Sequence, residues 1–264
     1  MADMTSPELD EAKARVRAQY GSVGDAYVKS AGHATGKDLA RMVEEAKPLP
    51  TDRLLDIATG GGHVARTFSP YVGQIVASDL TPEILHHAGV AFAEQGLTNI
   101  ETRIADAESL PFDDGSFEIV TCRIAPHHFP HPDRFVSEVA RVLTSGGRFI
   151  LIDSTVPDGE AGLFVNRIEK LRDPSHVRSL TIAEWQAMLV ENGFDIATVE
   201  TFPKRHDFAE WTSRSRMAGS DREALANIIL NAPDATKAAL NVEIADGQLI
   251  AFSDTKTLFA ANLA

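Results

Sequence analysis

The sequence predicts an α/β fold organised around a doubly wound, mostly parallel sheet. From residue 52 to about residue 155, short apolar runs alternate with helical patterns, and turns such as Asp113-Asp114-Gly115 separate them. A glycine-rich turn follows the first apolar run, and a charged side chain ends or follows each of the next three. The carboxyl ends of parallel strands meet at one edge of a sheet, so these residues are expected to surround one crevice.

The first strand and its turn lie within residues 53–67, RLLDIATGGGHVART. A short apolar strand leads into a glycine turn over 58–62, and a helix is expected from about His63. Successive glycines allow a tight turn and leave no Cβ between the backbone and a ligand. The helix N-terminus offers unpaired N–H groups and a partial positive charge, which suits a nucleotide-type cofactor. An ordinary strand–helix turn is the alternative, and the later strands decide between the two.

The later strands end in polar side chains at informative positions. Asp79 lies about twenty residues after the glycines, the spacing at which a carboxylate reaches ribose hydroxyls from the neighbouring strand. Pro82 then begins a helix. The expected strands and their terminal residues are 74–79 with Asp79, about 100–104 with Asp106, and 117–122 with Arg123.

The remaining chain adds a fifth strand, a lid and a helical insertion. A helix from Pro132 through Leu143 and a turn over 145–147 precede the fifth strand. A stretch at about 156–180 is too long for a simple crossover and is expected to form a lid. Thr181 and Glu184 fit a capping box that begins the next helix. The other expected segments are a helical leader over 1–47, strands at 148–153 and 194–202, a helical insertion at about 208–240, and a last strand within 250–263.

The composition narrows the class of protein. Its 264 residues are 44% apolar and 24% charged, which is ordinary for a globular chain. The formal charge of −13 argues against a nucleic-acid partner, because phosphate backbones are bound by clustered lysines and arginines. No apolar run is long enough to insert in a membrane, and the polar N-terminus lacks a signal-peptide core, so a cytoplasmic location is expected. The single cysteine, Cys122, excludes an internal disulfide. The oligomeric state is left open, a homodimer included.

Four stretches in order carry a family resemblance. DIATGGGHVA, the strand ending at Asp79, IADAESLPFDDGSFEIVTCR and HHFPHPDRFVSEVARVLTSGGRFILID closely resemble the class I S-adenosylmethionine-dependent methyltransferases. The match spans roughly residues 52–155 and is closest to the small-molecule branch that includes the ubiquinone/menaquinone-biosynthesis methylases. It implies a seven-stranded, Rossmann-like sheet whose final strand is inserted antiparallel beside the sixth. It also implies that the methyltransferase domain spans 48–264, with 1–47 as its leader or cap.

The resemblance implies S-adenosyl-L-methionine as cofactor, S-adenosyl-L-homocysteine as product and a small-molecule acceptor as partner. The glycine-turn backbone would face the amino-acid moiety of the cofactor, Asp79 its ribose hydroxyls, and Asp106 its adenine amino group. The family often has glycine at position 58, and alanine fits the same conformation if its φ is negative. The candidate cofactor-binding residues are Tyr27, His33, Asp56, Ala58, Thr59, Gly60, Gly62, Asp79, Leu80, Asp106, Ala107 and Arg123.

His127 and His128 are the candidate catalytic residues, because a histidine near neutrality takes a proton from an acceptor hydroxyl or acidic carbon. The structural alternative is that one caps the following helix while the other packs against Phe129. No metal site is expected from the histidines here, since no set of carboxylates or cysteines accompanies them. In the lid, His176 and Arg178 either clamp an anionic substrate or lie on a solvated loop, and the solvated loop is favoured.

Three functions are compatible with these features. The leading one is methyl transfer to a small molecule, whose accepting atom the sequence does not name. The second uses the same fold and cofactor for a cyclisation or rearrangement, and the third is non-catalytic cofactor binding. NAD also suits the glycine turn and Asp79, and the pair Asp106-Ala107 favours S-adenosylmethionine over it. Methylation of adenine amino groups is disfavoured, because RIAPHHF over 123–129 replaces the Asn/Asp-Pro-Pro-aromatic run of those enzymes.

Overall fold

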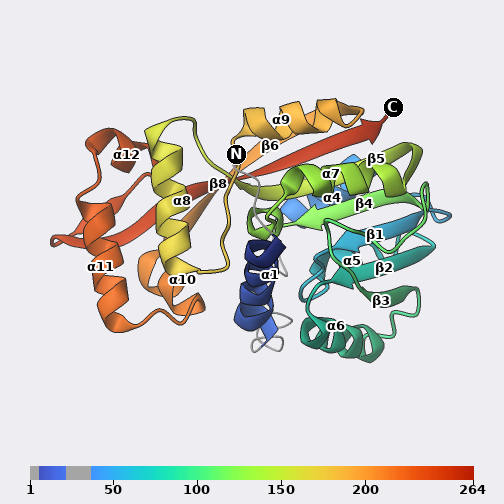
Figure 1. The fold of residues 1–264 in the computed structure, drawn as a ribbon, viewed down its shortest axis with the longest axis horizontal. Helices are drawn as coiled ribbons and strands as arrows, with labels where there is room; N and C mark the ends of the chain where they lie inside the picture. Colours follow the sequence, from blue (N-terminus) through green and yellow to red (C-terminus); the bar gives the residue numbers. More distant parts are fainter. Residues whose placement is uncertain (1–5, 22–36) are drawn as a thin grey trace.

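The computed structural model describes residues 6–21 and 37–264, so Tyr27 and His33 lie outside the described residues. One sheet with the order β3-β2-β1-β4-β5-β8-β6 runs through the protein, and β7 pairs with β8 (Figure 1). The strands are β1 Arg53–Ile57, β2 Gln74–Asp79, β3 Ile100–Ile104, β4 Phe117–Arg123, β5 Leu143–Thr155, β6 Phe194–Asp207, β7 Glu243–Ala245 and β8 Gln248–Leu263.

The pairing of these strands confirms the doubly wound, mostly parallel sheet. The first five strands pair in parallel, whereas β8 is antiparallel to both β5 and β6. The final strand is therefore inserted beside the sixth, and the short β7 is an addition to the seven expected strands. The strand order reverses between β1 and β4, which is where open α/β sheets bind their ligands.

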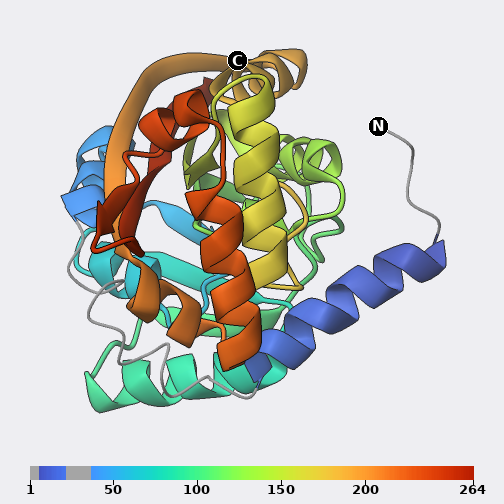
Figure 2. The ribbon, with the colours of Figure 1, turned by 90° about the vertical axis from the view of Figure 1, so that its left-hand side faces the viewer.

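Helices cover both faces of the sheet, as a doubly wound fold requires. Apolar side chains of α4, α5 and α6 pack on one face, and those of α7 and α9 pack on the other. The helix α1 contacts α6 near one end and projects away from it at the edge of the molecule (Figure 2). The bounds of these helices are α1 Ser6–Gly21, α4 Lys37–Ala46, α5 His63–Phe68, α6 Pro82–Glu94, α7 Pro132–Val142 and α9 Ile182–Glu191, with the 3₁₀ turn η1 at Pro126–His128.

The expected lid and helical insertion form one cap with a hydrophobic core of its own. The cap consists of α8 Glu160–Arg172, α10 Phe208–Arg214, α11 Gly219–Leu230, α12 Asp234–Ala239 and β7. Ile168 of α8 is buried with Trp211 of α10 and Ile229 of α11. The cap stands beside the sheet on the extended ends of β6 and β8 (Figure 1). The two segments therefore belong to one structural unit, although residues 181–207, which contain α9 and β6, separate them in the chain.

Three sequence boundaries need correction. The sixth strand does not stop at residue 202 but runs to Asp207, and it accommodates Pro203 because β6 is an edge strand. The turn expected over 145–147 is a bulge inside β5, where Gly146 has φ 73°. In the leader, α1 begins at Ser6, before the expected residue 9.

Other local predictions are confirmed. The side chain of Thr181 accepts a hydrogen bond from the Glu184 N–H, and the Glu184 carboxylate accepts one from the Thr181 N–H. Cys122 is a buried free thiol in β4. Among the described helices, none has the length and apolar character needed to cross a membrane.

Candidate active site

Two cavities meet at the carboxyl edge of the sheet. A narrow cavity of about 110 Å³ lies over the ends of β2 and β3, and a wide cavity of about 520 Å³ lies between the sheet and the cap. Both cavities are lined by the glycine turn and by the segment that follows β4; the residues they share are Ala58, Gly60, Ile124 and His128. A ligand that spans the two cavities therefore crosses the switch point between β1 and β4.

Asp56 holds the glycine turn from below. Its buried carboxylate accepts hydrogen bonds from the Thr59 hydroxyl at 2.6 Å and from the Thr121 hydroxyl of β4 at 2.9 Å. Burial raises the pKa of Asp56 to about 6, and these two hydrogen bonds oppose the shift. Asp56 thus ties the turn to β4 in the way expected of a residue that orients it.

Ala58 has φ 53°, so the expectation that this alanine takes a negative φ is wrong. The turn leaves β1 so tightly that the left-handed region is required, which costs about 1–2 kcal/mol for a residue with a Cβ. Ile124, at the end of β4, also has a positive φ of 55°. Both strained residues line both cavities, which fits the tendency of backbone strain to gather at functional sites.

Gly60 and Gly62 of the turn have different roles. A Cβ at Gly60 would meet no atom within 4 Å, and the Gly60 N–H donates to Asp79 at 3.0 Å. A Cβ at Gly62 would lie 2.4 Å from the ring of Phe92 in α6. Gly62 is not among the described lining residues of either cavity, and its lack of a side chain leaves room for Phe92.

The narrow cavity collects six of the predicted cofactor residues: Ala58, Gly60, Asp79, Leu80, Asp106 and Ala107. The Asp79 carboxylate is held at both oxygens, since one accepts from the Gly60 N–H and the other from the Thr81 N–H at 2.9 Å. Burial raises the pKa of Asp79, while these backbone hydrogen bonds act against the rise. Carboxylate oxygens that keep further lone pairs, at the tip of β2, suit the recognition of hydroxyl groups.

Lys13 also lines this cavity, although no motif in the sequence indicated it. Its ammonium group lies 2.6 Å from Asp106 and 2.9 Å from Glu108, so α1 is fastened to the loop after β3. Burial lowers the pKa of Lys13, but the hydrogen bonds to these two carboxylates outweigh that effect and leave it raised. No local pattern could reveal a contact between residues 93 positions apart.

Arg123 lines the wide cavity and also anchors the leader. Its guanidinium donates to Asp38 of α4 at 2.7 Å, and its side chain is only 8% exposed. Thr59 lines the same cavity beside it. Arg123 therefore connects the end of β4 to the leader and faces the space between sheet and cap.

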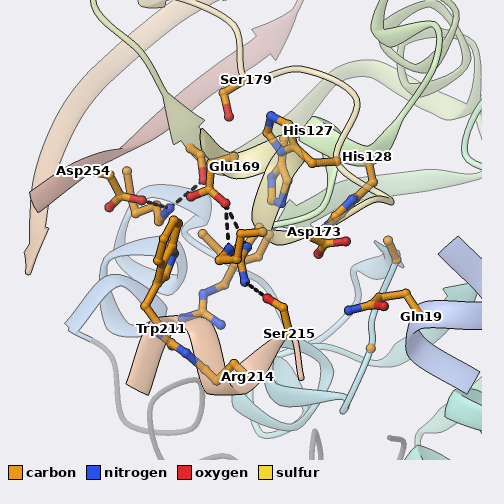
Figure 3. A pocket seen from close by; sticks show the side chains of 18 of the residues that line it. Gln19, His127, His128, Glu169, Asp173, Ser179, Trp211, Arg214, Ser215 and Asp254 are labelled. Carbon is orange, nitrogen blue, oxygen red and sulfur yellow. Dashed lines mark hydrogen bonds and ion pairs between the residues drawn. The ribbon is translucent and has the colours of Figure 1, made fainter. Parts of the chain in front are cut away.

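A group of histidines forms the wall of the wide cavity between η1 and the cap (Figure 3). The Nδ1 of His127 lies 2.6 Å from the buried carboxylate of Asp153 at the end of β5. If Nδ1 carries the proton of this hydrogen bond, Nε2 is the nitrogen that accepts one. The rings of His127 and His128 are 4.2 Å apart, and that of His176 lies 5.6 Å from His127.

His128 and His176 are buried, and the environment keeps both rings neutral. Burial lowers the pKa of each, and the neighbouring His127 lowers it further. His176 lies 3.0 Å from the Asn166 side chain of α8 and is 2% exposed, so the expected solvated loop is wrong at this residue. Arg178 pairs with Glu184 and is not a lining residue. Within residues 6–21 and 37–264, no group of three or more His, Cys, Asp or Glu side chains could hold a metal ion.

The far wall of the wide cavity comes from the cap and was not identified from the sequence. Arg172 of α8 pairs with Glu169 and lies over the Trp211 ring at 5.0 Å. Lys204 of β6 and Lys256 of β8 add two cations to the same wall. Trp211 packs against Phe252 and also lines the cavity.

Ala58→Gly should raise the free energy of unfolding by about 0.5–1 kcal/mol, because glycine adopts a positive φ without the Cβ penalty. Urea denaturation of both proteins measures the change. Gly60→Ala is the matched reverse substitution, since its φ is +52° and its added Cβ has open space, and it should lower stability by a similar amount. A less stable Ala58→Gly protein would contradict the left-handed turn.

His176→Gln should flatten the pH dependence of stability below about pH 6.5. In the wild type, the unfolded chain binds a proton at His176 in this range and the folded chain does not, because burial lowers the pKa of His176. The free energy of unfolding therefore decreases as the pH is lowered, by up to about 1.4 kcal/mol per pH unit, and glutamine removes that contribution. Urea denaturation at about pH 7, 6 and 5 measures the slope of unfolding free energy against pH. His86→Gln, on the exposed part of α6, should keep the wild-type slope; equal slopes in all three proteins would refute the neutral buried His176.

Comparison with known proteins gives the family. A family model described as a methyltransferase domain matches residues 55–151. The Bacillus subtilis protein YcgJ, an uncharacterized methyltransferase, is 37% identical over 221 residues, which cover 83% of this chain and 87% of YcgJ. A solved Bacillus halodurans structure, described as a methyltransferase, has a TM-score of 0.84 at 38% identity, covering 86% of this chain and 99% of its own.

A more distant relative lies in the branch that the sequence motifs indicated. The ubiquinone/menaquinone biosynthesis C-methyltransferase UbiE of Pseudomonas entomophila is 32% identical over 170 residues, which cover 56% of this chain and 66% of UbiE. Dependence on S-adenosylmethionine is a property that this family implies. The chain belongs to the class I S-adenosylmethionine-dependent methyltransferases.

Proposed function

We propose that this protein transfers a methyl group from S-adenosylmethionine to a small-molecule acceptor that lies in the wide cavity. The observation that supports this most is the convergence of Asp79, Asp106 and the glycine turn around the narrow cavity, which meets the wide cavity at Ala58 and Gly60. A cofactor with its adenosine in the narrow cavity then has its reactive end at the junction. The wide cavity, about 520 Å³, is large enough for a metabolite-sized acceptor.

The residues of the narrow cavity fit the adenosine part of the cofactor. The Asp79 carboxylate is acceptor-only when ionised and suits the two ribose hydroxyls, and Leu80 offers an apolar surface to the base. Asp106 suits the adenine amino group, and its ion pair with Lys13 brings α1 over the same end of the site. Gly60 leaves open space where a side chain would obstruct the chain of the cofactor.

When bound, S-adenosylmethionine supplies the electrophile, a methyl group on a sulfonium. The protein then has to align the acceptor with that methyl group and keep water out. The walls that do so are the histidine group on one side and the cap on the other. The proposal includes closure of the site by the cap and the leader.

His127 is the residue best placed to take a proton from the acceptor. Asp153 orients its ring through Nδ1 at 2.6 Å and would stabilise the imidazolium that forms. His128 is less suited, because burial and His127 lower its pKa and so disfavour its charged form. Acceptors that lose no proton would need neither residue.

Release of S-adenosylhomocysteine tests the proposal against its rivals. A library of small metabolites is incubated with the protein and S-adenosylmethionine, and S-adenosylhomocysteine and methylated product are measured by mass spectrometry. Equal amounts of both with one acceptor support methyl transfer. An altered acceptor without S-adenosylhomocysteine would support the cyclisation or rearrangement, and binding without any product would support a non-catalytic role.

Asp79→Asn should weaken S-adenosylhomocysteine binding about 10- to 100-fold, because a charge-assisted hydrogen bond contributes about 1.5–3 kcal/mol. Asparagine retains the size of the side chain, so the chain should still fold. Isothermal titration calorimetry gives the affinities, and Glu83→Gln on the exposed first turn of α6 is the control. Unchanged affinity in Asp79→Asn, or a larger rise in melting temperature with NAD than with S-adenosylhomocysteine, would overturn the assignment.

A further inference from the structure

The cap-side wall of the wide cavity is a row of polar side chains on three neighbouring strands, β5, β8 and β6. Lys204 of β6 is the cross-strand partner of Asp254 in β8, and Lys256 lies opposite Ser154 of β5. The Lys256 ammonium lies 2.7 Å from Asp254 and donates to the Ser154 hydroxyl at 2.5 Å. Arg214 of α10 extends this wall next to Trp211 (Figure 3).

Positive charge exceeds negative charge in this cavity, although the whole chain carries a formal charge of −13. Among the described residues, six lysine and arginine side chains line it against four carboxylates. An acidic protein that gathers cations around one cavity creates a local field that attracts anions.

The excess positive charge lies at Lys204 and Arg214, because most of the other cations that line the cavity have acidic partners. Arg123 pairs with Asp38 and Arg172 with Glu169. The carboxylate of Asp254 is shared between Lys256 at 2.7 Å and His206 at 3.0 Å. For Lys204, no carboxylate among residues 6–21 and 37–264 lies within ion-pair distance, and Arg214 contacts the His206 ring at 3.3 Å.

Lys204 is therefore a partly buried cation beside other cations. Burial lowers its pKa most, and Lys256 and Arg214 lower it further. A buried ammonium is stable when an opposite charge and hydrogen-bond acceptors surround it. The described residues around Lys204 offer the charge of Asp254 only in part, since two other groups already bind that carboxylate.

We propose that the acceptor carries an oxyanion, a phosphate or carboxylate group, which Lys204, Lys256 and Arg214 bind on the cap side of the wide cavity. This inference rests on the proposed function, because it names the class of molecule that receives the methyl group. The oxyanion would supply the missing counter-charge to Lys204 and would hold the rest of the acceptor toward the glycine turn. The Trp211 ring on the same wall would contact the part of the acceptor next to its charge.

Small anions test this site without knowledge of the acceptor. Pyrophosphate and malonate are titrated by calorimetry into the full chain in low-salt buffer, with S-adenosylhomocysteine present at saturation. The bound S-adenosylhomocysteine occupies the position of the cofactor's own carboxylate, so any further anion site is separate from it. At least one of the two anions should bind with one-to-one stoichiometry, and added salt should weaken it.

Lys204→Gln should weaken that binding about 10- to 100-fold, the effect of losing one charge-assisted hydrogen bond. Arg205→Gln is the matched control, because Arg205 is the next residue of β6, faces the opposite side, and pairs with Glu243 outside the cavity. It removes the same charge from the chain and should leave anion affinity unchanged. Neither substitution should alter the affinity for S-adenosylhomocysteine.

The outcomes separate this inference from the proposed function. Binding of pyrophosphate alone supports a phosphate acceptor, binding of malonate alone a carboxylate, and binding of both a general oxyanion site. If S-adenosylhomocysteine binds but neither anion does, the inference is wrong and the proposed function stands. Anion binding that disappears when S-adenosylhomocysteine is bound, or equal losses in Lys204→Gln and Arg205→Gln, also overturns it. If S-adenosylhomocysteine itself fails to bind the wild type, the proposed function fails.

Discussion

The antiparallel pairing of β6 with β8 is the interaction on which the site depends. The paired residues run from Phe194 with Leu263 at one end to Asp207 with Ala251 at the other. One end of this ribbon completes the central sheet beside β5, and the other end carries the cap. Because backbone hydrogen bonds fix both strands along their length, the sheet sets the position of the cap-side wall. A lid on loops alone would lack this support.

At the glycine turn and the end of β4, buried hydrogen bonds compensate for local backbone strain. Ala58 and Ile124 have positive φ values that cost free energy in any isolated peptide. Asp56 stabilises the turn through Thr59 and also reaches Thr121 in β4, so the strained conformation is held by two adjacent strands. Such over-determination allows a backbone N–H, that of Gly60, to be directed at Asp79.

The two cavities differ in charge as well as in size. The narrow cavity is mostly apolar, and its described charged residues are the acidic Asp79, Asp106 and Glu108 with Lys13 from α1 facing the last two. The wide cavity is rich in cations and histidines, with Asp153 supporting His127 behind the wall. A sulfonium cofactor and an anionic acceptor would thus meet at the junction with opposite charges. In the proposed reaction, the acidic residues of the narrow cavity would attract the sulfonium cofactor, and the cations of the wide cavity would attract the acceptor.

The sequence by itself determined the sheet and the residues gathered at the narrow cavity. Strand ends at Asp79 and Arg123 and the capping box at Thr181 could be predicted because each depends on residues within a few positions of one another. The parallel order of the strands then brings Asp79 and Asp106 to one edge whatever the details of packing. The left-handed φ of Ala58 was missed, since no local pattern distinguishes this alanine from one in an ordinary turn.

Only the tertiary structure decided the wide cavity and its walls. Lys13 reaches Asp106 across 93 residues, and His127 reaches Asp153 across 26. The wall that holds Lys204 and Lys256 exists because β8 enters the sheet between β5 and β6 and continues into the cap. In the sequence these lysines belong to polar segments far apart, with no pattern that pairs them. Strand register brings them together, and register is set by long-range hydrogen bonds and the burial of one face.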